Sequence, residues 1–95
     1  MTGLTIGKQF LIFNDTTYDS IMNNLFLELE INELTWDNKS RFIDYFMDNY
    51  MVCLESIFDE NDLIVDGDDI DNNELNTIFD EFEEYLNYVL KMSCK

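Results

Sequence analysis

Apolar side chains recur along most of the chain at the three- and four-residue spacing of an α-helix. The pattern predicts three helices, over residues 16–32, over residues 35–58, and from just after Asp71 to near the end of the chain. No Ser/Gly linker and no internal repeat interrupts them. We therefore expect one mainly α domain over residues 1–95, a small bundle of about three helices.

The first predicted helix opens at Thr16-x-x-Asp19, which resembles a capping box with a shortened acid. Its apolar positions are Tyr18, Ile21, Met22, Leu25 and Leu29. Residues 27–32, however, alternate strictly between apolar and polar side chains, as a strand does. An alternative is therefore an α+β fold, in which residues 27–32 form a small hairpin with residues 9–13. Residues 4–13 are in either case expected to be a short strand or an extended arm.

The second predicted helix carries a long apolar stripe: Ile43, Phe46, Met47, Tyr50, Leu54, Ile57 and Phe58. This stripe is wider than one line of contact with a neighbouring helix, because it also includes Phe42, Tyr45 and Val52. The width predicts a helix at the centre of the core, or one shared with a second subunit in a homodimer. Tyr45, Tyr50, Tyr85 and Tyr88 are alternatively anchors for a partner, although aromatic side chains at helical spacing more often pack in a core.

The third predicted helix follows the capping box Asp71-x-x-Glu74 and ends near Lys91 and Lys95, whose charges suit a helix C-terminus. Its apolar face comprises Leu75, Ile78, Phe79, Phe82, Leu86, Val89 and Leu90. The connection over residues 59–73 is acidic but contains Leu63-Ile64-Val65. We expect this triplet to fold back onto the core.

Charge narrows the range of functions. The chain has 21 acidic and 5 basic residues, a formal charge of −16, although 46% of its residues are apolar. This charge rules out ordinary nucleic-acid binding and argues against binding to anionic membranes, because both depend on Lys and Arg. No apolar run is long enough to cross a membrane, and MTGLTIGKQF lacks the features of a signal peptide. We expect a cytoplasmic protein, in the host cytoplasm if it is viral.

Catalysis is not expected. The chain has no histidine, so it offers neither a Ser-His or Cys-His nucleophile pair nor an imidazole ligand for a metal. Cys53 and Cys94 are too few for a thiolate zinc site and are expected to be free thiols. No cofactor is indicated.

The second predicted helix arranges its acids in one row. Asp37, Asp44, Asp48, Glu55 and Asp59 follow at spacings of 7, 4, 7 and 4, which keeps them within a narrow stripe of a continuous helix. Such a row would be about 33 Å long, with a carboxylate every 6 to 10 Å. Between Phe42 and Leu90 no Lys or Arg is present to neutralise it.

The remaining acids extend this surface through the loop and the third predicted helix. They are Glu60, Asp62, Asp66, Asp68, Asp69, Asp71, Glu74, Asp80, Glu81 and Glu84. The charge of −16 is comparable with the roughly 19 phosphates on a length of duplex DNA equal to the expected diameter of the domain. These carboxylates predict a DNA mimic that occupies the nucleic-acid-binding site of a basic protein.

Such a surface is similar in kind to those of phage anti-restriction and anti-CRISPR inhibitors. Ala and Pro are both absent while Asn and Asp abound, a composition compatible with an AT-rich genome such as that of a virus or mobile element.

Two alternatives use the same acids. The first is an acidic module that binds another protein without imitating DNA. The second is a degenerate EF-hand around Asp66-Gly67-Asp68, which binds calcium. With Gly67 at the sixth position of the loop, Ile64 falls at the third and Asn73 at the twelfth, so the calcium ligands are not kept.

Overall fold

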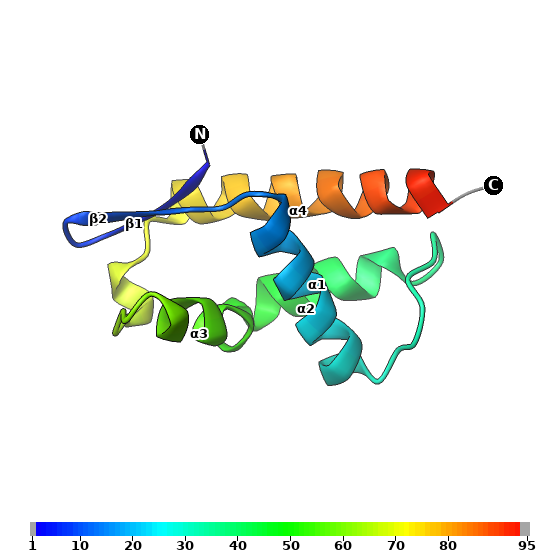
Figure 1. Cartoon of the computed structure of the whole chain (residues 1–95), viewed down its shortest axis with the longest axis horizontal. Helices are drawn as coiled ribbons and strands as arrows, with labels where there is room; N and C mark the ends of the chain where they lie inside the picture. Colours follow the sequence, from blue (N-terminus) through cyan, green and yellow to red (C-terminus); the bar gives the residue numbers. More distant parts are fainter. Residues whose placement is uncertain (1, 94–95) are drawn as a thin grey trace.

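The computed structural model describes residues 2–93, which form four α-helices and one hairpin in a body of 44 × 26 × 21 Å (Figure 1). The elements are β1 (Gly3–Ile6), β2 (Gln9–Ile12), α1 (Asp15–Leu29), α2 (Lys39–Asp48), α3 (Tyr50–Glu60), the short 3-10 helix η1 (Gly67–Asp69) and α4 (Asn72–Ser93). The mainly helical fold is confirmed, with four helices rather than three and a small N-terminal hairpin.

The hairpin lies within the segment predicted to be extended. β1 and β2 pair antiparallel, with Gly3 opposite Ile12 and Ile6 opposite Gln9. Gly7 turns the chain at a φ of +60°, a conformation that glycine adopts without steric cost. The strand partner of residues 9–12 is therefore the preceding segment, and the alternative pairing with residues 27–32 is wrong.

Helix α1 begins one residue earlier than predicted because Asn14, rather than Thr16, is its cap. The Asn14 side-chain oxygen accepts the Thr17 N–H at 3.1 Å, and the Thr17 hydroxyl accepts the Asn14 N–H at 3.3 Å. The helix ends at Leu29, where Glu30 takes a left-handed conformation and its N–H donates to the Leu27 carbonyl oxygen. Residues 27–29 are helical, so their alternation does not mark a strand.

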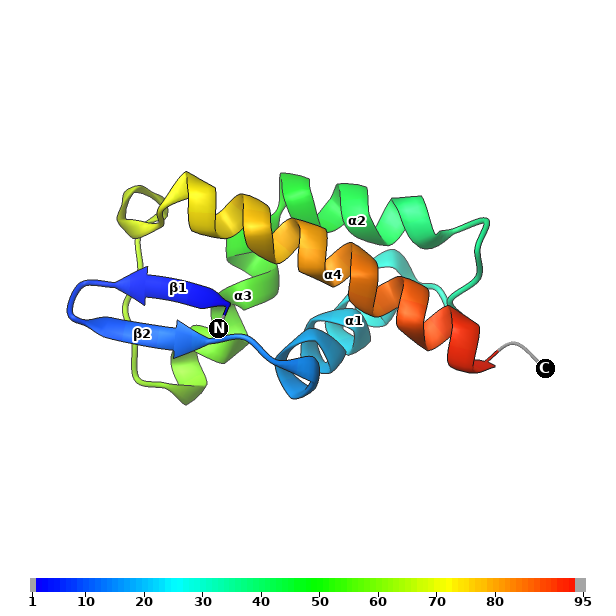
Figure 2. The same cartoon turned by 90° about the horizontal axis from the view of Figure 1, so that it is seen from above.

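The predicted helix over 35–58 is divided into α2 and α3 at Asn49. The Asn49 side-chain amide donates to the Tyr45 carbonyl oxygen at 3.2 Å, as its own backbone N–H does at 2.9 Å. Asparagine favours such local bonds over regular helix, and the Asn49 backbone leaves the helical region with φ −133° and ψ 36°. Figure 2 shows α2 and α3 running in different directions.

A turn precedes α2 where the sequence predicts the start of a helix. Thr35 N–H donates to the Asn38 side-chain oxygen at 2.8 Å, and Asn38 N–H donates to the Thr35 hydroxyl at 3.2 Å. Regular helix follows only from Lys39. Asp37 therefore lies outside α2.

Helix α4 begins where the sequence predicts it and extends along most of the molecule (Figure 1). The Asp71 carboxylate accepts the N–H groups of Asn73 and Glu74 at 2.8 and 3.2 Å. The Glu74 carboxylate, however, accepts both the N–H and the hydroxyl of Thr5, each at 2.9 Å, and so connects α4 to β1. Lys91 lies in the last turn, and Lys95 lies outside the described residues.

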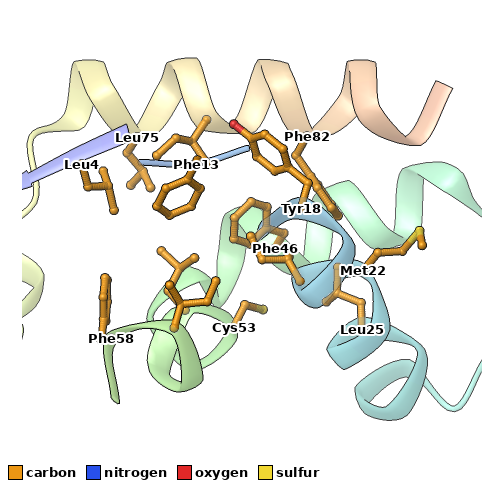
Figure 3. Packing of buried hydrophobic residues seen from close by; sticks show 14 of the residues in the cluster. Leu4, Phe13, Tyr18, Met22, Leu25, Phe46, Cys53, Phe58, Leu75 and Phe82 are labelled. Carbon is orange, nitrogen blue, oxygen red and sulfur yellow. The ribbon is translucent and has the colours of Figure 1, made fainter. Parts of the chain in front are cut away.

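One hydrophobic core joins all four helices and the hairpin (Figure 3). Phe42 and Phe46 of α2 are fully buried against α1 and α4, and Tyr45 and Tyr50 pack at the margin of the core. The broad apolar face of the predicted second helix therefore packs largely within the core of one copy of the chain. The homodimer stays a prediction that sedimentation would test.

The prediction that residues 63–65 fold back onto the core is confirmed in part. Leu63 and Val65 pack against the core, but Ile64 between them is 98% exposed. Among residues 2–93, no helix combines the length and the apolar content needed to span a membrane.

Candidate functional site

The predicted row of acids does not form one straight line. Asp37 lies in the turn before α2, Asp44 and Asp48 lie on α2, and Glu55 and Asp59 lie on α3 beyond the break. Because α2 and α3 run in different directions (Figure 2), their carboxylates do not continue as one helical stripe across Asn49. The 33 Å row is therefore wrong, since it required a continuous helix.

Several predicted site residues instead hold the fold together. Asp71 caps α4, and Glu74 anchors β1. Glu81 accepts the hydroxyl of Thr2 at 2.6 Å and that of Tyr18 at 2.8 Å, while Asp69 accepts the Asp66 N–H at 3.1 Å. Both oxygens of Glu81 are occupied, which makes it a structural residue rather than a free contact for a partner.

Ten other predicted site residues are exposed carboxylates that accept no hydrogen bond from residues 2–93, and we call these the free carboxylates. They are Asp37, Asp44, Asp48, Glu55, Asp59, Glu60, Asp62, Asp68, Asp80 and Glu84. Each is exposed, so its acceptor oxygens are accessible to a partner. A donor-rich cationic partner is the chemistry that such groups fit.

Basic residues neutralise little of this surface. Within residues 2–93 the one ion pair joins Lys39 to Glu83, with Nζ and Oε2 3.9 Å apart. Lys39 also donates to the Asn87 side-chain oxygen at 2.7 Å, and its Nζ lies 5.6 Å from the centre of the Trp36 ring. Lys39 is thus held at the start of α2, away from the α3 carboxylates.

A second anionic feature is a hollow of about 310 Å³ beside the start of α1 and the middle of α4. Its lining combines carboxylates with aromatic rings: Phe13, Asn14, Asp15, Tyr18, Glu81, Glu84, Tyr85 and Tyr88. Tyr85 donates its hydroxyl to Asp19 at 3.1 Å. Asp15, which lines this hollow, and Asp19, which binds Tyr85, were not among the predicted site residues. Both are exposed acids in the first two turns of α1, next to the buried Tyr18, and an acid at such a position beside an inward-facing tyrosine is the signal that could have identified them.

The two tyrosines report the local electrostatics. Burial and the hydrogen bond to Glu81 raise the pKa of the Tyr18 hydroxyl far above its ordinary value. Burial and the hydrogen bond to Asp19 raise the pKa of Tyr85 to about 12. Asp15 raises both pKa values further. This side of the molecule therefore favours neutral or cationic groups over a further anion.

We expect the fold to lose stability as the pH rises above about 10. Unfolded tyrosines ionise near that pH, whereas Tyr85 keeps its proton to about pH 12 and Tyr18 to a still higher pH. Because the folded-state pKa is raised, the stabilisation is complete below pH 10 and declines towards pH 12 and beyond. Urea unfolding between about pH 9 and pH 12 measures it. A Tyr18→Phe variant should show a weaker pH dependence, and an unchanged dependence would contradict this assignment.

The described residues offer no clear centre for metal or thiolate chemistry. Among residues 2–93, no group of three or more Cys, Asp or Glu side chains is arranged to hold a metal ion. Cys53 is buried, and burial raises the pKa of its thiol to about 11, so the thiol is protonated at neutral pH. Cys94 lies outside the described residues.

The candidate site is thus an extended surface of free carboxylates over α2, α3, the acidic loop and α4. Comparisons with family models, with curated proteins and with solved structures find no match to the chain. What the surface can do chemically is attract a basic partner at long range and accept hydrogen bonds from its Lys and Arg side chains.

Proposed function

We propose that the chain is a DNA mimic, whose surface carboxylates occupy the nucleic-acid-binding site of a basic protein and so inhibit it. The observation that carries this proposal is the set of ten free carboxylates, none of which accepts a hydrogen bond from residues 2–93. The proposal includes a phage or mobile-element origin, of the anti-restriction or anti-CRISPR kind. It assigns the chain a binding role and no catalysis.

The charge density of the surface supports the proposal. The molecule is 44 Å long and carries a formal charge of −16. Duplex DNA of that length carries about 26 phosphates, so the two charge densities are of the same order. Regular helices hold most of the free carboxylates, which lowers the entropy lost when a partner binds.

The electrostatic repulsion within this surface also supports a role in binding a partner. Like charges that are not paired destabilise the folded state by mutual repulsion. Asp71, Glu74 and Glu81 offset that repulsion through their hydrogen bonds, but the free carboxylates have no such compensation within residues 2–93. A basic partner supplies the missing compensation.

The experiment that tests the proposal is capture from a bacterial extract on the immobilised chain. A partner should bind at low salt, elute as salt is raised, and be released by excess duplex DNA. A neutral polymer at the same mass concentration is the control and should release nothing. A captured protein that excess duplex does not displace would contradict mimicry and favour an ordinary acidic interaction module.

A further inference from the structure

Helix α3 carries a ridge of side chains that the rest of residues 2–93 leaves exposed. Its residues Val52, Glu55 and Asp59 follow at the spacing of one helical face and are shared by two adjoining hollows. One hollow, of about 340 Å³, lies between α3 and residues 63–65. The other, of about 290 Å³, lies between α3 and the part of α1 that includes Leu27 and Glu28.

Three aliphatic side chains on this face are unusually exposed. Ile64 is 98% exposed, Leu27 78% and Val52 55%. Each borders one of the two hollows, and Val52 borders both. Large aliphatic groups gathered on one face in this way are typical of protein interaction sites.

The loop geometry explains why Ile64 points outward. Asp62 takes a left-handed backbone conformation with φ +55°, and Leu63 N–H then donates to the Phe58 carbonyl oxygen at 2.9 Å. With Leu63 and Val65 packed against the core, the residue between them is directed to solvent. The exposure of Ile64 therefore follows from the turn that ends α3 and from the packing of its two neighbours.

We propose that this α3 face binds a cationic amphipathic helix of the partner protein. Glu28, Glu55 and Asp59 lie among the exposed aliphatic side chains, and no Lys or Arg of residues 2–93 lines either hollow. Apolar side chains of the partner helix fill the two hollows, while its Lys and Arg side chains pair with the three carboxylates. This inference rests on the proposed function and names the kind of segment that the basic partner presents.

Charge argues against a second copy of the chain as the occupant. A second copy would bring its own Glu28, Glu55 and Asp59 against the same groups in a self-complementary interface. Like charges placed opposite each other weaken such a contact. A cationic helix, in contrast, neutralises them.

The test uses a synthetic helical peptide with Leu on one face and Lys on the other. The control peptide has the same composition but a shuffled order without an apolar face. Binding is measured by fluorescence anisotropy in about 0.5 M salt, where screening reduces charge interactions to a range of a few Å. We expect the amphipathic peptide to bind at least about tenfold more tightly than the shuffled one, because only it fills the hollows.

Two variants locate the binding face. Val52→Ser with Ile64→Ser should weaken binding of the amphipathic peptide about tenfold, since both side chains are exposed and border the hollows. Met92→Ser removes a comparably exposed apolar group at the end of α4 and should change binding little. Circular dichroism checks that both variants fold.

Equal binding of the two peptides would overturn the proposal, as would full binding by the Val52 and Ile64 variant. A homodimer in sedimentation that this variant abolishes would also overturn it, because the occupant would then be a second copy. None of these measurements contains DNA. The docking proposal can therefore fail while displacement of the captured partner by duplex still supports mimicry.

Discussion

Replacing Phe82 with alanine is expected to lower the free energy of unfolding by about 3–5 kcal/mol, which is a large part of the stability of a domain of this size. The Phe82 ring is fully buried at the middle of α4. Its centre lies 4.9 Å from that of Phe46 and 6.3 Å from that of Tyr18 (Figure 3). Truncation leaves a cavity where α1, α2 and α4 meet. Urea denaturation measures the loss.

Phe10→Ala is the matched control, because it makes the same change on the surface. Phe10 lies on β2 and is 47% exposed. Its truncation should cost no more than about 1 kcal/mol. Similar losses for the two variants would contradict the central position of Phe82.

Replacing Asp44 and Asp48 with asparagine is expected to weaken binding of the basic partner about 30-fold in about 0.15 M salt, equivalent to about 2 kcal/mol. The two free carboxylates lie one turn apart on α2 and do not stabilise the fold through hydrogen bonds within residues 2–93. Their removal relieves repulsion, so stability should be unchanged or slightly higher. Titration of the purified partner with each variant measures the affinity.

A second pair of substitutions separates position from net charge. Glu30→Gln with Glu33→Gln also removes two charges, but from the connection between α1 and α2. This control should weaken binding less than about threefold, since distant charges are screened. Equal losses for both pairs would show that net charge alone drives binding, and no loss for either would place the contact away from α2.

The helices could be predicted because local signals and long-range packing agree there. In α4, the Asp71 cap and the apolar positions from Leu75 to Leu90 indicate the same helix, and the structure confirms it. In residues 27–32 the alternation of Leu27, Leu29 and Ile31 suggested a strand. The pairing of β1 with β2 and the left-handed Glu30 decided that conflict in favour of a helix and a short N-terminal hairpin.

The arrangement of the acids was harder to predict, because it depends on one residue. The apolar stripe continues through Asn49 without interruption, so the spacing of Asp44, Asp48 and Glu55 suggested a single row. The Asn49 side chain, through its bond to the Tyr45 carbonyl oxygen, marks the position where the helix divides. The sequence also leaves unresolved which acids serve the fold, because the partners of Glu74 and Glu81, Thr5 and Thr2, lie about 70 to 80 residues away.

The most direct test of DNA mimicry is competition between the chain and duplex DNA for the captured partner. Fluorescence anisotropy of a labelled duplex gives its apparent Kd for the partner at increasing concentrations of the chain. We expect this Kd to rise in proportion to the concentration of the chain, with complete release of the duplex, because both ligands require the same site. A partner that binds the duplex and the chain together, with the Kd for DNA unchanged, would contradict the account.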